Sequence, residues 1–296
     1  MNVEAYLGER RTLVDATLAG ILRPSEGTPP RLLEAMRYAV LSGGKRVRPI
    51  LALAACEAAP ADERHALPFA CAIELIHAYS LVHDDLPAMD DDALRRGRPT
   101  VHVQYGEALA ILVGDALLTE AFRVAADGAR AAGVDAERAL AMIERLAVAA
   151  GAAGMVGGQV ADLEAEGGRP DRATVEAIHR RKTAALISAA IDVGALAGGA
   201  DGARREALAD YGRALGLAFQ IADDILDATA PSAVTGKREG GDAAHGKATY
   251  PAALGIDGAR AAARELLGRC LAATEALGDP ADPLRAIARF VVGRAC

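Results

Sequence analysis

The segment His83–Gly97, HDDLPAMDDDALRRG, places five carboxylates within nine residues and follows them with two arginines. Pro87 disfavours helical geometry at Leu86, so a helix that carries Asp84 should end or bend there and let Asp90 turn back toward Asp84. Grouped carboxylate oxygens suit Mg²⁺, which keeps several waters and is bound by one or two carboxylates together with substrate phosphates. The segment therefore predicts a magnesium site that uses phosphate as a further ligand.

A second acidic cluster lies in FQIADDILDATA, residues 219–230. On a helix, Asp223, Asp224 and Asp227 are three and four residues apart and share one face. Apolar neighbours show that this segment packs against other parts of the protein, where unpaired charge is costly. One such cluster could equally be a solvated acidic turn, but two clusters favour a metal site. An EF-hand is excluded because the alternating ligands, central Gly and terminal Glu of that loop are missing.

Basic residues near Gly-containing loops supply the opposite charge. Arginine presents a planar fork of donors that matches phosphate geometry, and Arg95 and Arg96 follow the first cluster directly. The others are Lys45, Arg46, Arg48, Lys182, Lys237 and Lys247. Each alone could be an ordinary surface charge. Together with two acidic clusters they predict two phosphate-bearing substrates, one held through metal and one held by basic side chains.

The elements that must position these residues are helices. Apolar residues return every three or four positions in Leu32–Val40, Ile50–Ala58, Pro68–His83, Glu107–Ala126, Ala136–Ala150, Thr174–Ala197, Ala203–Asp227, Ala248–Leu254, Ala259–Leu277 and Pro283–Val292. Clear strand alternation is absent, and Gly- and Pro-containing turns separate the helical segments. No stretch has the composition of a linker. We expect an all-α fold in which residues 1–296 form a single domain of about ten helices.

Composition narrows the function classes. The net charge of −7 and the pI near 5.5 give no general attraction to nucleic acid or anionic membranes. No stretch reaches 18 uncharged apolar residues, so no membrane span is expected, and the charged N-terminal segment does not resemble a signal peptide. The four cysteines are far apart, which predicts neither a zinc site nor a disulfide framework and favours a cytoplasmic location.

With these residues in view, the chain resembles the trans-isoprenyl diphosphate synthases, most closely the bacterial farnesyl diphosphate synthases. The resemblance runs in order through GGKRVRP, ELIHAYSLVHDDLPAMDDDALRRGRPTVH, GDALLTEAF, GMVGGQVADL, RRKTAALI, FQIADDILDATA and GKREGGDAAHGKATYPAALG. It implies a helical bundle around a deep central cavity, usually as a homodimer. It also implies head-to-tail condensation of isopentenyl diphosphate with dimethylallyl or geranyl diphosphate, assisted by several Mg²⁺ ions, with Mn²⁺ as an alternative.

The resemblance assigns roles to individual residues. Metal ligation is implied for Asp84, Asp85, Asp90, Asp223, Asp224 and Asp227. Binding of the allylic diphosphate is implied for Arg95, Lys182, Thr183, Gln220, Lys237 and Lys247, the first four also being catalytic. Binding of isopentenyl diphosphate is implied for Lys45, Arg48, His77 and Arg96.

Product length should depend on the floor of the cavity. Tyr79 precedes Asp84 by five residues, or roughly 7.5 Å along a helix, where its bulk would stop a growing chain. Together with Ser80 it resembles the pattern of farnesyl synthases, which we prefer over geranylgeranyl and then geranyl synthases. Tyr79 could also be an ordinary core residue.

Other interpretations stay open at this stage. His77, His83, Asp84 and His179 superficially resemble an HD-type metal phosphohydrolase, which leaves the second cluster unexplained. A terpene cyclase would share the first acidic motif but differ in the second. An inactive subunit of a heteromeric synthase is disfavoured by the intact clusters. Many relatives end in a basic tail, whereas this chain ends RFVVGRAC, with Arg294 as the charge nearest the end.

Overall fold

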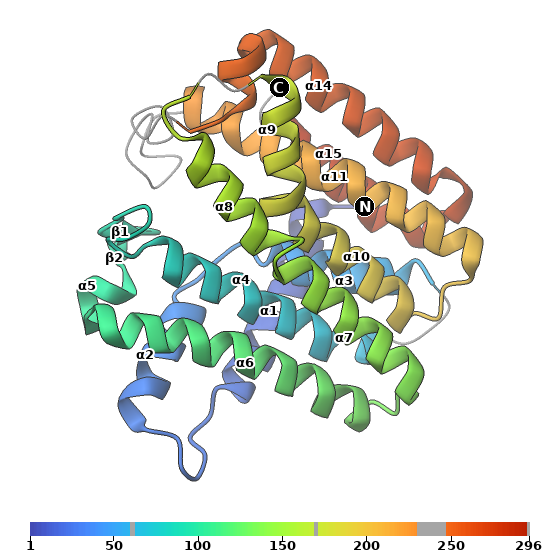
Figure 1. Ribbon diagram of the computed structural model, residues 1–296. Helices are drawn as coiled ribbons and strands as arrows, with labels where there is room; N and C mark the ends of the chain where they lie inside the picture. Colours follow the sequence, from blue (N-terminus) through green and yellow to red (C-terminus); the bar gives the residue numbers. More distant parts are fainter. Residues whose placement is uncertain (60–62, 169–170, 230–246, 295–296) are drawn as a thin grey trace.

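The structure is a computed structural model that describes residues 1–59, 63–168, 171–229 and 247–294, and these are almost entirely helical (Figure 1). The α-helices are α1 (Val3–Ile21), α2 (Pro30–Leu41), α3 (Val47–Glu57), α4 (Leu67–Asp84), α5 (Val101–Tyr105), α6 (Glu107–Ala131), α7 (Ala136–Ala150), α8 (Met155–Ala165), α9 (Arg172–His179), α10 (Ala185–Ala197), α11 (Gly202–Thr229), α14 (Tyr250–Thr274) and α15 (Asp282–Gly293). Short turns of 3₁₀-helix are η1 (Glu63–His65), η3 (Glu275–Leu277) and η4 (Asp279–Ala281), and η2 (Arg180–Ala184) is a π-helical turn.

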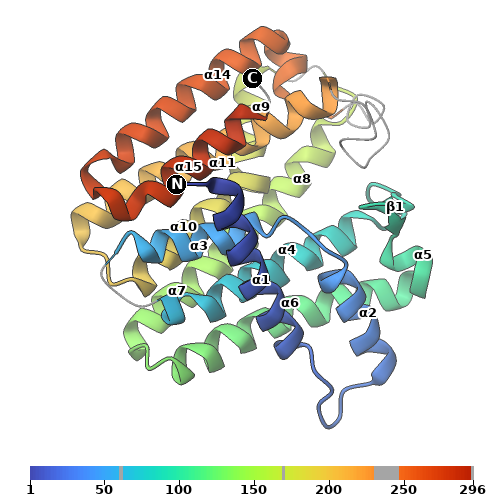
Figure 2. The same ribbon diagram turned by 180° about the vertical axis from the view of Figure 1, so that it is seen from behind.

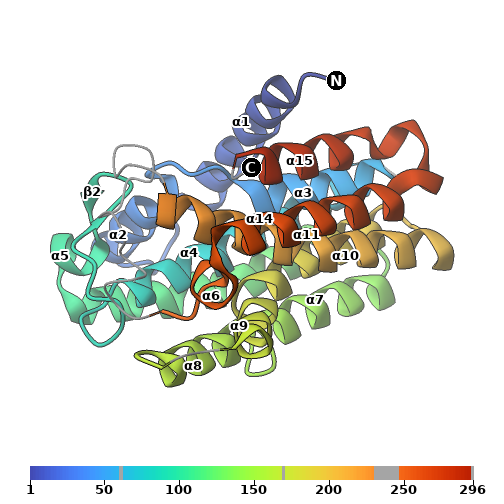
Figure 3. The same ribbon diagram turned by 90° about the horizontal axis from the view of Figure 1, so that it is seen from above.

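Helices α3 and α10 form the centre of the bundle. Every residue of α3 from Pro49 to Cys56 is buried, as expected for a helix that is apolar all round. The two helices approach closely, since a Cβ added to Gly194 would lie 2.1 Å from the carbonyl oxygen of Ala52. The core continues on both sides of this pair, with α4, α6 and α7 on one side and α11, α14 and α15 on the other (Figure 3).

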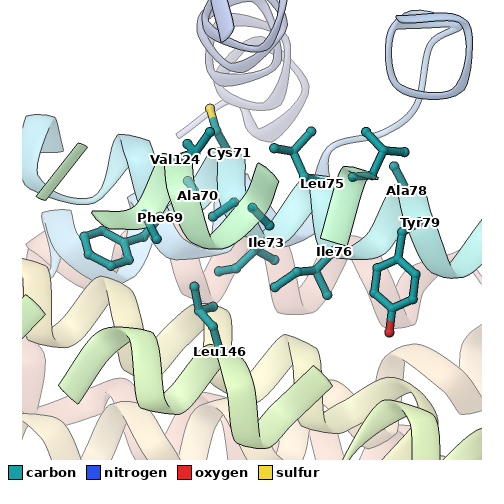
Figure 4. Close-up of a cluster of buried hydrophobic side chains, with 14 of the residues drawn as sticks. Phe69, Ala70, Cys71, Ile73, Leu75, Ile76, Ala78, Tyr79, Val124 and Leu146 are labelled. Carbon is teal, nitrogen blue, oxygen red and sulfur yellow. The ribbon is translucent and has the colours of Figure 1, made fainter. Parts of the chain in front are cut away.

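Helix α4 carries the first acidic cluster at its C-terminal end. Figure 4 shows Phe69, Ile73, Ile76 and Tyr79 on one side of α4, facing the helix that carries Leu146. All of them are buried in the same hydrophobic cluster. The apolar packing of α4 therefore fixes the direction in which Asp84, at its last turn, enters the site.

Three helices were not expected from the sequence, the short α5 and the longer α1 and α8. Helix α1 crosses the back of the molecule over α3 (Figure 2). It buries Tyr6, Val14 and Leu18, and several of its charged residues are exposed. Helix α8 forms in spite of the glycines in its first turn. In both, a sparse apolar face is enough because neighbouring helices cover it.

Two expected segments also differ in detail. The segment Thr174–Ala197 is helical throughout but contains the π-helical turn η2 between α9 and α10. The segments Ala248–Leu254 and Ala259–Leu277 lie mostly in α14, which is interrupted at Gly255, where φ is +71° and ψ is +165°. A Gly at that position relieves the strain that a side chain would meet at positive φ.

A small hairpin follows the first acidic cluster. Strands β1 (Leu94–Arg95) and β2 (Arg98–Pro99) pair antiparallel, with Leu94 opposite Pro99 and Arg95 opposite Arg98. The two turn residues, Arg96 and Gly97, both have positive φ, which is the requirement of the tight turn that matches strand twist. The RRGR sequence thus forms a turn that aims Arg95 back toward α4.

One stretch among the described residues, 136–165, is long and apolar enough by length and composition to cross a membrane. The chain breaks this stretch at Gly151 and Gly154 into α7 and α8, and α7 buries Met142 and Leu146 in the core. The continuous helix that a bilayer crossing requires is therefore not formed there.

Candidate active site

One large cavity, with a volume of about 1060 Å³, opens between the ends of α4 and α11. Asp84 and Asp90 line it from one side, and Asp223 and Asp227 line it from α11. Apolar side chains from α4, α6 and α8 line its interior, including Tyr79, Ile111 and Val160. The two acidic clusters, more than 130 residues apart in sequence, therefore face the same space.

The turn after α4 explains how Asp90 reaches Asp84. Helix α4 ends at Asp84, three residues before Pro87, as the sequence predicted. The chain then folds back, so that the backbone N–H of Asp90 donates to the carbonyl oxygen of Asp84 at 2.8 Å. Asp91 occupies the left-handed region, with φ of +49°, and completes the reversal.

The buried setting of Asp84 suits a cation. Burial is the main cause that raises the pKa of its carboxyl to about 6, with Lys182 lowering it and Asp90 raising it. Within the described ranges, no three His, Cys, Asp or Glu side chains lie close enough to hold a metal ion by themselves. An all-oxygen donor set divided between two walls fits a hard divalent ion that also takes ligands from phosphate and water.

Asp85 and Arg95 form a close pair at the edge of this wall. The Arg95 Nε donates to both carboxylate oxygens of Asp85, at 2.7 and 2.9 Å, and its Nη2 lies 2.5 Å from Oδ1. The Asp85 side chain is buried, and burial raises its pKa while Arg95 opposes that change. In this arrangement Asp85 holds Arg95 in place at the cavity rim. The assignment of Asp85 as a metal ligand stays a prediction.

Asp224 is engaged by the protein itself. Its Oδ1 accepts from Gln220 Nε2 at 2.7 Å, and its Oδ2 accepts from the backbone N–H of Tyr250 at 2.9 Å. The Thr183 hydroxyl donates to the Gln220 amide oxygen at 2.6 Å. The side chain of Asp224 is 1% exposed, against 43% for Asp223. Asp224 therefore orients the pair Thr183–Gln220 and fixes the start of α14, and its predicted role as a metal ligand is still untested.

Lys182 and Thr183 reach the cavity from the π-helical turn η2. Helix α8 packs directly on this turn, because a Cβ on Gly158 would lie 2.2 Å from the Lys182 backbone nitrogen. Lys182 Nζ lies 2.5 Å from Asp162 Oδ2. Asp162 follows Gly158 by one turn of α8. The buried Asp162 was missed in the sequence, although a charged residue within the apolar stretch GMVGGQVADL was a signal for it.

His179 was named in the sequence only for the phosphohydrolase interpretation, and its neighbours were not predicted. It lies at the end of α9, stacks on Tyr250 with ring centroids 5.6 Å apart, and has its Nε2 3.6 Å from Asp224 Oδ2. Burial lowers the pKa of His179 to about 4, although Asp162 raises it. His179 is therefore neutral at neutral pH and supports the Asp224 wall as a packing residue.

The residues predicted for isopentenyl diphosphate divide into two groups. Lys45, Arg48 and His77 line the large cavity. Burial lowers the pKa of each, and Arg48 adds to the effect on His77, whose pKa falls well below its usual value. Arg96 instead lines a smaller adjoining cavity beside His77 and donates to the carbonyl of Gly43. Its predicted contact with substrate is untested.

The remaining predicted residues lie as follows. Tyr79 and Ser80 line the cavity, and Tyr79 meets His83 edge to face with centroids 5.8 Å apart. Lys247 lines the cavity and has its Nζ 3.3 Å from both oxygens of Asp90. Lys237 lies outside the described residues.

Arg294 brings the C-terminal end of the chain to the site. Its guanidinium lies 3.6 Å from Asp223 and stacks over Phe219 at 5.6 Å from the ring centroid. It lines the cavity and contributes to the lowered pKa of Lys45. The sequence showed Arg294 as the charge nearest the end but gave no sign of its contact with α11.

An apolar cavity with carboxylates on two walls and cations at its rim suits substrates that join a hydrocarbon chain to a diphosphate. This combination of fold and site defines the class of prenyl-transferring synthases. The model of the family described as polyprenyl synthetase matches residues 29–282, and the chain belongs to that family.

Individual relatives agree with this. The chain is 47% identical over 265 residues to the farnesyl diphosphate synthase of Geobacillus stearothermophilus, covering 88% of this chain and 87% of the relative. It is 46% identical over 275 residues to geranylgeranyl pyrophosphate synthase 11, chloroplastic, of Arabidopsis thaliana, covering 90% and 75%. The apo crystal structure of an FPP/GFPP synthase from Zymomonas mobilis is similar with a TM-score of 0.87 and 40% identity, covering 98% and 99%. The protein is thus a prenyltransferase, which decides against the phosphohydrolase interpretation.

Proposed function

We propose that the protein condenses isopentenyl diphosphate head to tail with dimethylallyl and then geranyl diphosphate, giving farnesyl diphosphate and diphosphate. The observation that carries the proposal is the pair of acidic walls, Asp84 and Asp90 facing Asp223 and Asp227, around one apolar cavity. Relatives named as farnesyl and as geranylgeranyl synthases are nearly equal in identity, so the product is argued from Tyr79.

The acidic walls would hold Mg²⁺, with Mn²⁺ as an alternative, and the bound metal would stabilise charge on the departing diphosphate. Arg95, Lys182 and Lys247 line the same cavity and each acts electrostatically on Asp84, so they would neutralise the remaining phosphate oxygens. Lys182 and Lys247 are paired with Asp162 and Asp90 in this structure, so substrate would compete for them with these carboxylates.

The interior of the cavity would protect the allylic cation that forms when the carbon–oxygen bond breaks. Apolar side chains exclude water, which would otherwise quench the cation. The oxygens of Thr183 and Gln220, linked at 2.6 Å, would orient the reacting carbons. The double bond of isopentenyl diphosphate then attacks, and the proton that is lost passes to the released diphosphate.

The second substrate would bind beside Lys45, Arg48 and His77. Lys45 and Arg48 carry the charge that matches its diphosphate, and the lowered pKa of His77 makes it a neutral hydrogen-bonding group. Tyr79 lies on the same helix and lines the cavity, where its ring would form the floor and stop the chain after three isoprene units.

We also propose a homodimer in the cytoplasm. Leu112 on α6 and Leu140 on α7 are 56% and 68% exposed, and covering them would gain free energy in a dimer. Cys71 and Cys270 are buried thiols, which agrees with a reducing compartment. Sedimentation at several concentrations would measure the mass, and a monomer at micromolar concentration would contradict the dimer.

The proposed reaction is tested by incubating the purified protein with isopentenyl diphosphate, Mg²⁺ and each allylic primer in turn, followed by analysis of chain length. We expect a fifteen-carbon product from dimethylallyl and geranyl diphosphate, and none in the presence of a chelator. Absence of prenyl transfer would overturn the proposal, and a twenty-carbon main product would overturn the choice of farnesyl diphosphate.

A further inference from the structure

Arg46 is a buried arginine next to the cavity that the proposed reaction does not use. It is 3% exposed, and its guanidinium donates from all three nitrogens. Nε donates to Asp15 at 2.8 Å, Nη1 to Glu74 at 2.7 Å, and Nη2 to the carbonyl oxygen of Val40 at 2.6 Å. Such a set of contacts requires the planar fork of arginine and cannot be reproduced by a lysine.

The three partners belong to three different helices. Asp15 lies in α1, Val40 near the end of α2, and Glu74 in α4. Arg46 itself precedes α3 and has a left-handed backbone, with φ of 50° and ψ of 34°. A non-glycine residue holds this conformation when the surrounding structure fixes it. The guanidinium therefore joins four helices at one point.

The neighbours of Arg46 in sequence face a different space. Lys45 and Arg48 both line the large cavity, whereas Arg46 and Glu74 do not and line the smaller adjoining cavity instead. Glu74 precedes His77 by three residues on α4, and His77 also lines the cavity. The contact between Arg46 and Glu74 thus ties the segment carrying Lys45 and Arg48 to the helix that carries His77.

We propose that Arg46 is a positioning residue for the isopentenyl diphosphate subsite, fixing Lys45 and Arg48 relative to His77. This inference rests on the proposed function, because it takes that subsite as assigned above. The allylic subsite uses Arg95, Lys182 and Lys247, which Arg46 does not contact. A change at Arg46 should therefore weaken binding of one substrate and leave the other unchanged.

Two variants test this. Arg46→Lys keeps the charge but loses the three-way fork. The double variant Arg46→Gln with Glu74→Gln removes the buried charge pair together, so that neither charge is left buried alone. Arg285→Lys is the matched control, since Arg285 also donates to two carbonyls and a carboxylate but does not line the cavity.

We expect KM for isopentenyl diphosphate to rise about tenfold in both Arg46 variants, with KM for geranyl diphosphate within twofold of the wild type. The double variant should keep the raised KM even where its Tm approaches that of the wild type. Equal changes in both KM values, or a lowered Tm with both KM values unchanged, would overturn the inference and leave Arg46 a structural residue.

Calorimetric titration with isopentenyl diphosphate separates this inference from the proposed function. Wild-type protein that binds the ligand tightly but transfers no prenyl group would overturn the proposed reaction, while weaker binding to the variants would still support Arg46. Equal binding by wild type and variants would overturn the role of Arg46 with the reaction intact. No binding to the wild type would overturn both.

Discussion

Lys182 and Asp162 form an ion pair, Nζ to Oδ2 at 2.5 Å, across the contact between η2 and α8. The contact depends on Gly158, whose added Cβ would meet the backbone of Lys182.

We therefore predict that Gly158→Ala lowers both stability and turnover. The backbone of η2 would have to shift, which costs about 1–3 kcal/mol of unfolding free energy and displaces Lys182 and Thr183. Urea unfolding and kcat measure the two effects. Gly268→Ala is the control, because Gly268 lies in a helix with nothing within 4 Å of its added Cβ. A Gly158→Ala protein with wild-type kcat would show that the close contact is unimportant.

The acidic walls are tested with amide variants. Asp84→Asn and Asp223→Asn should each lower kcat by orders of magnitude, because each removes a carboxylate from one wall while keeping its size. Circular dichroism should show unchanged helicity. Asp91→Asn is the control, since Asp91 is exposed in the same cluster and does not line the cavity. Full activity in either wall variant would refute the metal assignment.

The floor of the cavity is tested at Tyr79. Replacing Tyr79 with Ala should lengthen the product beyond fifteen carbons, because the cavity deepens where the ring lay. Tyr79→Phe keeps the ring and its contact with His83, and it should keep the wild-type product. Chain-length analysis by chromatography distinguishes the cases. An unchanged product in the Ala variant would place the floor elsewhere.

The reactivity of two buried thiols should depend on whether the protein is folded. Burial raises the pKa of both Cys71 and Cys270 to about 12. At pH 8 only about one in ten thousand of each would be a thiolate, the reactive form. Peptide mapping after brief treatment with iodoacetamide should find both unmodified in the native protein and alkylated in urea. Rapid labelling of either in the native protein would contradict the burial.

The sequence predicted the elements whose signals are local. The helical fold followed from apolar periodicity, and the end of α4 followed from Pro87. The interruption of α14 at Gly255 fell between two predicted segments. Helix α1 was missed because Tyr6, Val14 and Leu18 are few among many charges. The single-domain interpretation stays a prediction.

The site was predictable where chemistry is clustered along the chain. The Asp clusters and the RRG arginines could be recognised because several charged residues lie close together in the sequence. Asp162 is a single acid twenty residues from Lys182, and the contact of Asp224 with the Tyr250 amide joins residues 26 apart. Such partners are chosen by packing, so the sequence alone showed neither.

The π-helical turn at Arg180–Ala184 fixes how α9 is rotated about the helix axis relative to α10. Each residue of an α-helix advances the chain by about 100°, and a π turn accommodates one residue more than an α turn. Deleting a residue there would twist α9 against α10 as well as shortening the segment. Either Lys182 and Thr183 would move out of the cavity, or the buried face of α9 would be exposed to water. Outside Lys182 and Thr183, this stretch should therefore tolerate substitutions better than insertions or deletions.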